Sequence, residues 1–160
     1  MRIAHFSDVH ALDLRLRDLR PWSFLNKRLA GGVNMLLKRR NRYPVRILDA
    51  LCQDLNRVAP DHAVLTGDLS NLSFPSELAR ARAALDGLTL GPRGVTVIPG
   101  NHDVYVWEAR FGRHFERALG PYALGDDAPD GALPTFPFVR VRGPVAFVAC
   151  CTALPSPPPL

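Results

Sequence analysis

Three short apolar runs alternate with two longer segments of helical periodicity, and this alternation constrains the fold more than any other feature of the chain. The runs cover residues 2–7, 63–66 and 95–98, and their length and composition are typical of buried strands. Between them, residues 45–58 and 75–88 carry apolar side chains at helical spacing. The order strand, helix, strand, helix, strand predicts right-handed crossovers and a parallel sheet with helices on its faces.

The pattern changes after the third run. Residues 105–119 are predicted to form a helix, and residues 120–134, rich in Gly, Pro and Asp, a loop. Two β-rich runs follow, 136–142 and 145–152, separated only by Gly143 and Pro144. This spacing predicts an antiparallel pair of strands. The chain is therefore expected to be an α/β protein in which a second, antiparallel sheet joins the parallel one.

Size and composition favour one globular domain over residues 1–160. The chain is 47% hydrophobic and 22% charged, which argues against a disordered protein. No apolar run approaches the roughly 20 residues that cross a bilayer, and the N-terminus does not resemble a cleaved leader. The three cysteines are typical of buried thiols in a reducing compartment. A cytoplasmic protein is expected.

Positive charge is concentrated in one segment. Residues 15–46 contain ten Lys and Arg residues and one acidic residue, Asp18, although the whole chain has a net charge of only +5. Within it, residues 15–43 are predicted to be a basic, partly amphipathic insertion, in which Trp22 and Phe24 are interleaved with Lys and Arg. Such a segment suits an interfacial helix on anionic lipid or a lid over an anionic substrate. It also suits a solvated insertion whose aromatic residues pack on the domain.

Each of the three predicted parallel strands ends in polar residues that can bind a divalent cation. These residues are Asp8 and His10, then Asp68, then Asn101 and His102. Because the carboxyl ends of parallel strands meet at one edge of a sheet, the side chains are expected to converge. A set of carboxylate, imidazole and amide ligands suits Mn²⁺, Fe or Zn²⁺. If two ions bind, one carboxylate must bridge them, and Asp68 on the middle strand is the candidate.

The three strand-end motifs differ in how specific each one is for a metal site when it occurs on its own. Asp8-Val9-His10 and Gly67-Asp68 are common by chance, whereas the tetrapeptide 100–103, Gly-Asn-His-Asp, is rare. All three together, in order and each after a predicted strand, resemble the first three motifs of the calcineurin-like metallophosphoesterase superfamily, D-x-H, G-D and G-N-H-[DE]. Their residues are similar to those of the bacterial branch that resembles cyclic nucleotide phosphodiesterases and nucleotide-lipid pyrophosphatases. The resemblance covers residues 2 to about 152.

The resemblance implies a fold and a role for each site residue. The fold would be a two-sheet β-sandwich flanked by helices. Asp8 and His10 would hold the first of two divalent metal ions, Asp68 would bridge both, and Asn101 would bind the second. His102 would contact the phosphoryl group and protonate or stabilise the leaving oxygen. The implied reaction is hydrolysis of a phosphodiester or phosphomonoester by a metal-bound hydroxide.

Asp103 has two alternative roles at this stage. It could orient His102, or it could cap the helix that follows. The other histidines, His5, His62 and His114, lie in contexts that favour structural or surface positions.

The sequence departs from the family pattern in two places. The superfamily also supplies a later lone His and a terminal G-H-x-H motif, and neither occurs in these 160 residues. The domain is therefore expected to be incomplete at its C-terminus, and its activity weak. The second motif also lacks the G-D-x-x-D-R-G extension of the protein phosphatase branch, so a phosphoserine phosphatase is disfavoured.

Two other hypotheses remain beside a phosphoesterase with a phosphoester substrate. The chain could be a non-catalytic module that binds an anionic membrane surface or phosphate through residues 15–46, at the inner face of the membrane. It could also be a fragment with no independent role. Binding of nucleic acid is not predicted, because charge alone supports it and no recognised module does.

Overall fold

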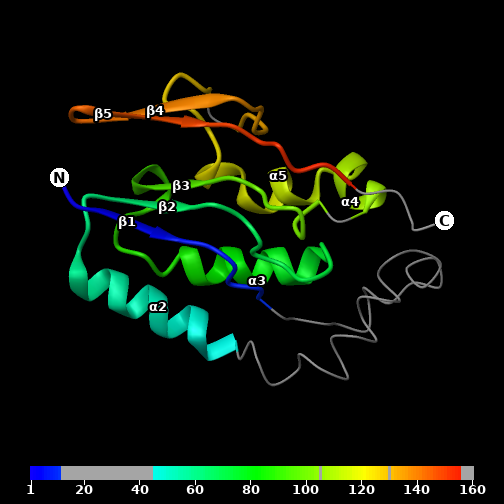
Figure 1. Ribbon diagram of the computed structural model, residues 1–160, viewed down its shortest axis with the longest axis horizontal. Coiled ribbons are helices and arrows are strands. Elements are labelled where there is room, and N and C mark those ends of the chain that lie inside the picture. The colour runs from blue at the N-terminus through cyan, green and yellow to red at the C-terminus, as the bar shows by residue number, and fades with distance from the viewer. Residues whose placement is uncertain (12–44, 105, 130, 156–160) are drawn as a thin grey trace.

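The computed structural model describes residues 1–11, 45–104, 106–129 and 131–155. It is an α/β structure with two sheets (Figure 1). The predicted basic insertion, residues 15–43, lies outside the described residues. Strands β1 (Ile3–Phe6), β2 (His62–Leu65) and β3 (Val95–Val97) form one sheet, and β4 (Phe138–Arg142) and β5 (Val145–Ala149) form the other. The two-sheet fold flanked by helices predicted from the sequence is confirmed.

The first sheet is parallel, with its strands in chain order. Ile3 of β1 pairs with His62 of β2, and Ala63 of β2 pairs with Val95 of β3. Helix α2 (Val45–Val58) connects the first two strands, and α3 (Pro75–Leu85) with the short 3-10 helix η4 (Pro92–Gly94) connects the next two. In Figure 1, α2 and α3 lie on one side of this sheet and the β4–β5 pair on the other. All three carboxyl ends therefore point to the same edge.

The core lies where these helices cover the sheet. The helical periodicity read from the sequence matches the buried face, because residues spaced three or four apart become inaccessible on both helices: Leu48, Cys52 and Leu55 on α2, and Leu78, Ala81 and Leu85 on α3. On the sheet, Leu65, Val95 and Val97 are fully buried. Burial of these side chains supplies the main free energy of folding. Among the described helices, none is both long and apolar enough to span a bilayer.

The single helix predicted over residues 105–119 is two short helices. Helix α4 covers Trp107–Phe111 and α5 covers His114–Leu119. Arg113 between them is left-handed, with φ of 50°, a conformation that cannot continue a right-handed helix. Gly112 lies against the His114 ring, which a Cβ at that position would crowd. A 3-10 helix, η5 (Gly120–Tyr122), follows directly.

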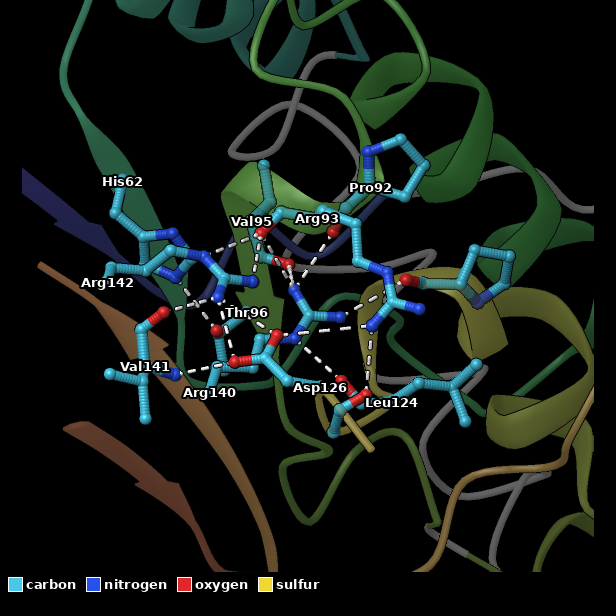
Figure 2. Close-up of polar contacts among 12 residues, drawn as sticks. His62, Pro92, Arg93, Val95, Thr96, Leu124, Asp126, Arg140, Val141 and Arg142 are labelled. Carbon is cyan, nitrogen blue, oxygen red and sulfur yellow. Dashed lines mark hydrogen bonds and ion pairs between the residues drawn. The ribbon is translucent and has the colours of Figure 1, made fainter. Parts of the chain in front are cut away.

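Arg140 ties the second sheet to the first. It is fully buried, and its guanidinium donates to the carbonyl oxygens of Leu124 at 2.6 Å, Pro92 at 2.9 Å and Val95 at 2.5 Å (Figure 2). Burial lowers its pKa to about 10. Val95 begins β3 and Arg140 lies in β4. The Arg140 side chain therefore links the two sheets at the amino-terminal end of β3.

An ion pair between Asp126 and Arg142, two residues after Arg140 in β4, fixes the loop before this strand. Asp126 accepts two bonds from Arg142, both at 2.9 Å, and one from the backbone N–H of Val141 at 2.7 Å (Figure 2). The loop 120–134 is thereby attached to β4. The antiparallel pairing of β4 and β5 predicted from the sequence is confirmed, with Phe138 opposite Ala149 and Arg142 opposite Val145.

Candidate metal centre

Three loops meet at the carboxyl edge of the parallel sheet. The segment after β1 continues alongside the segment after β2: the N–H of Asp8 donates to Gly67 at 3.1 Å, that of His10 to Asp68 at 3.0 Å, and that of Ala11 to Leu69 at 2.6 Å. Parallel pairing thus extends beyond the strands. It fixes Asp8, His10 and Asp68 relative to one another through the backbone.

Two glycines allow the loops after β2 and β3 to approach closely. Gly67 has a φ of 95°, and a Cβ there would collide with the backbone nitrogen of Gly100. A Cβ on Gly100 would in turn collide with the carboxylate and the backbone nitrogen of Asp68. Only glycine removes both conflicts. The glycines of the second and third sequence motifs therefore bring the Asp68 loop against the 100–103 turn.

Asp8, His10 and Asp68 form a compact cluster of candidate metal ligands. One ligand atom from each lies within 4.8 Å of the others, and Nε2 of His10 is 3.9 Å from Oδ1 of Asp8. All three residues are left-handed, with φ of 57°, 43° and 55° respectively. Each such residue costs about 1–3 kcal/mol, and Asp and His tolerate this conformation better than most residues do. Among the described residues, these three make up half of the six non-glycine residues with positive φ.

The tautomer of His10 follows from its hydrogen bond. Its Nδ1 lies 3.2 Å from the carbonyl oxygen of Ser70. A carbonyl can only accept, so Nδ1 carries the proton and Nε2 the lone pair. His10 is buried, and this desolvation lowers its pKa. The neutral ring is the form that can coordinate a cation.

The 100–103 turn places His102 beside this cluster. The backbone N–H of His102 donates to Oδ1 of Asp68 at 3.0 Å. The His102 and His10 rings meet edge to face, with centroids 5.1 Å apart. Asn101 is exposed, and both of its neighbours, Gly100 and His102, contact Asp68. Asn101 and His102 therefore lie on the turn that meets the Asp68 loop.

The imidazole of His102 is held by a residue that sequence reasoning did not single out. Its Nδ1 lies 2.7 Å from the carbonyl oxygen of Asn71, so Nδ1 carries a proton and donates it to that carbonyl. The Asn71 side chain donates to the carbonyl of His10 at 2.9 Å. Asn71 thus joins both histidines. It follows the second motif by only three positions, and this proximity is the signal that could have identified it.

Asp103 fastens the turn to the Asp68 loop. Its fully buried carboxylate accepts bonds from the backbone N–H groups of Ser70 at 2.8 Å and Gly100 at 2.9 Å, and from the Ser70 hydroxyl at 3.0 Å. Desolvation raises its pKa to about 6, although the hydrogen bonds favour the charged carboxylate and partly oppose this rise. Helix capping is not its role, because α4 begins at Trp107 and its N-cap residue is Val106.

The remaining histidines lie in other surroundings. Nε2 of His5 is 2.8 Å from the Thr66 hydroxyl, Nε2 of His62 is 2.9 Å from the Thr96 hydroxyl, and Nδ1 of His114 is 3.3 Å from the Ser73 carbonyl. The part of the chain that the structure describes contains one cluster of three His, Cys or acidic residues close enough to hold a metal. This cluster is Asp8, His10 and Asp68.

The cluster fits a divalent cation of the borderline type. Ligands of one ion, each about 2.1 Å from it, lie about 3 to 4 Å apart, and the separation of 3.9 Å between His10 and Asp8 is within that range. Two carboxylates and an imidazole with its lone pair on Nε2 are a donor set suited to Mn²⁺, Fe or Zn²⁺. The Ser70 carbonyl supplies the outer hydrogen bond that a coordinating histidine needs.

Comparison with known proteins agrees with this geometry. No curated protein matches the chain. The family model for calcineurin-like phosphoesterase matches residues 1–145, which include all three strand-end loops and the start of β5. The chain belongs to the calcineurin-like phosphoesterase family.

Proposed function

We propose that this protein hydrolyses phosphoesters with the help of two divalent cations, Mn, Fe or Zn. Asp8 and His10 would hold the first cation, Asp68 would lie between the two, and Asn101 would bind the second. The observation that carries this proposal is the grouping of Asp8, His10 and Asp68 within 4.8 Å. Family membership supports metal-dependent phosphoesterase chemistry at the coarse level.

The chemistry divides between the cations and the chain. Bound divalent cations would supply Lewis acidity, which neutralises phosphoryl charge and lowers the pKa of water. His102 would protonate or stabilise the leaving oxygen through Nε2, because Nδ1 is engaged with Asn71. Asp103 would position His102 indirectly, since Ser70 bonds both the Asp103 carboxylate at 3.0 Å and the His102 carbonyl at 3.1 Å.

The residues of the second motif favour a phosphodiester over a phosphorylated protein as substrate. The second motif reads Gly67-Asp68-Leu69-Ser70 and continues Asn71-Leu72, without the extension of the protein phosphatase branch. This supports a small phosphodiester of the kind that the cyclic-nucleotide branch hydrolyses. A phosphomonoester remains the second substrate type of the proposal.

Metal content and hydrolysis of an aryl phosphodiester test the proposal together. Asp68→Asn is expected to lose bound metal and activity, because it weakens the shared ligand. His102→Ala is expected to keep its metal and lose about 10²–10⁴-fold in kcat, the usual contribution of a general acid. Asp127→Asn, at an exposed carboxylate away from the cluster, is the matched control. Full activity in Asp68→Asn would refute the assignment.

The membrane hypothesis for residues 15–46 rests on the sequence alone. Binding to vesicles that contain anionic lipid, retained in Asp68→Asn and lost when the basic residues are replaced, would support it. The two functions are separable, because Asp68 lies outside the basic segment.

A further inference from the structure

A pocket beside the 100–103 turn is lined by exposed aromatic residues. Its volume is about 750 Å³, and its walls come from Pro99 and Val104, from Trp107 and Phe111 of α4, and from Leu154 after β5. In Figure 1, α4 and the chain after β5 lie at the same end of the molecule. The volume is within the range of sites for small organic ligands.

The aromatic side chains of α4 are exposed to an unusual degree. Trp107 is 48% exposed and Phe111 76% exposed. They lie one helical turn apart, and their rings stack at an angle of 21° with centroids 5.4 Å apart. Leu154, 72% exposed, lines the same pocket. Three large apolar side chains that gather in one place without burial are typical of a binding site.

The pocket is connected to the site through the backbone. Pro99 and Val104 directly flank the 100–103 turn that carries His102. A second connection runs through Ser73, whose hydroxyl donates to the His102 carbonyl at 2.6 Å and whose own carbonyl is 3.3 Å from His114 at the start of α5. A group that occupies the pocket would therefore lie beside the turn.

The pocket also carries positive charge. Arg110 pairs with Glu116 at 3.1 Å, and Arg113 donates to the neutral carbonyl of Pro134 at 2.7 Å. Both arginines and Glu116 line the pocket. Glu116 offsets the charge of Arg110, whereas Arg113 meets an uncharged acceptor, so the lining has a net positive charge that suits an anionic ligand.

We infer that Trp107 and Phe111 form a specificity subsite for a planar aromatic group on the phosphoester substrate. This inference rests on the proposed phosphoesterase function and adds a substrate class to it. The ring would stack on the outer face of the aromatic pair, while the phosphoryl group extends toward the 100–103 turn. Stacking favours a flat ring over a saturated group of equal size.

Binding of non-hydrolysable phosphonates tests the subsite. Phenylphosphonate, cyclohexylphosphonate and methylphosphonate share one anionic head and differ in the attached group. With Mn²⁺-loaded protein, calorimetry is expected to show phenylphosphonate binding roughly three- to tenfold more tightly than either of the others. In Phe111→Leu, which keeps an apolar side chain without a ring, this preference should disappear. Ile47→Ala, at a residue 59% exposed on α2, should retain it.

Two results would overturn the subsite. Equal affinity for phenylphosphonate and cyclohexylphosphonate would show that any apolar group suffices, and a preference that survives in Phe111→Leu would place the ring elsewhere. Neither result depends on turnover. A protein that hydrolyses phosphodiesters yet shows no ring preference contradicts the subsite alone, whereas a ring preference without hydrolysis contradicts the proposed reaction alone.

Discussion

At the scale of single residues, the site is built from conformations that most side chains avoid. Asp8, His10 and Asp68 all have positive φ, and Gly67 and Gly100 are in contact where any Cβ would collide. The sequence identified the candidate ligand residues from their types and their positions after strands. It could not predict that the carbonyls of Ser70 and Asn71 accept hydrogen bonds from the two imidazoles, because these bonds depend on how the loops pack in three dimensions.

Gly100→Ala is expected to weaken metal binding by about 10–100-fold, the usual effect of disturbing a group that orients a ligand. The new Cβ would meet the Asp68 carboxylate. Gly120→Ala is the matched control, since its Cβ would lie 3.7 Å from Pro134, an ordinary contact. Titration with Mn²⁺ measures both affinities, and unchanged affinity in Gly100→Ala would contradict the close approach of the two loops.

His62 is expected to make stability depend on pH. It is fully buried, and desolvation, followed by Arg142 and Arg140, lowers its pKa to about 4, while Asp126 opposes the shift. Between pH 6.5 and 4 the unfolded chain binds the proton that the folded chain excludes. His62 therefore contributes stability above pH 6.5, and this contribution is lost as the pH falls toward 4.

Denaturant unfolding of the wild type and of His62→Asn measures this effect. From pH 7 to pH 4.5 the wild type should lose about 2 kcal/mol more of its free energy of unfolding than the variant does. Parallel losses in the two proteins would mean that His62 is not the group responsible.

At the scale of elements, the short apolar runs and helical periods predicted β1, β2, β3, α2 and α3 in type and order. The prediction failed between residues 105 and 119, where the left-handed Arg113 divides one expected helix into two. In β4 the alternation is the reverse of the usual one: Arg140 is buried, and Val139 and Val141 are 44% and 56% exposed. Four carbonyl groups from two other segments, 92–95 and 121–124, make this arrangement favourable, and neither segment is near Arg140 in sequence.

Arg140→Lys is expected to destabilise the fold by about 2–4 kcal/mol. Lysine keeps the charge but cannot reach the carbonyls of Leu124, Pro92 and Val95 together, so buried acceptors lose their donors. Arg57→Lys, at a side chain 77% exposed, should change stability by less than about 0.5 kcal/mol. Thermal or denaturant unfolding compares the two. Equal, small effects would show that the bonds of Arg140 do not hold the sheets together.

At the scale of the whole molecule, one end of the parallel sheet holds the second sheet and the other end carries the candidate site. Arg140 and its acceptors secure the second sheet at the amino end of β3, while the carboxyl edge carries the strained cluster and the aromatic pocket near it. Strand order alone places three polar motifs at one edge, which is why this much of the site was predictable. The pocket was not, because its walls come from α4 and from the chain after β5, distant segments that the fold brings together.

A crystal structure of the protein soaked in Mn²⁺, with data collected at the manganese absorption edge, tests the metal assignment most directly. We expect an anomalous difference peak bounded by Oδ1 of Asp8, Nε2 of His10 and the Asp68 carboxylate, about 2.0–2.3 Å from each. The peak should be absent in crystals of Asp68→Asn. A peak elsewhere in the wild type, with none among these three side chains, would contradict the account.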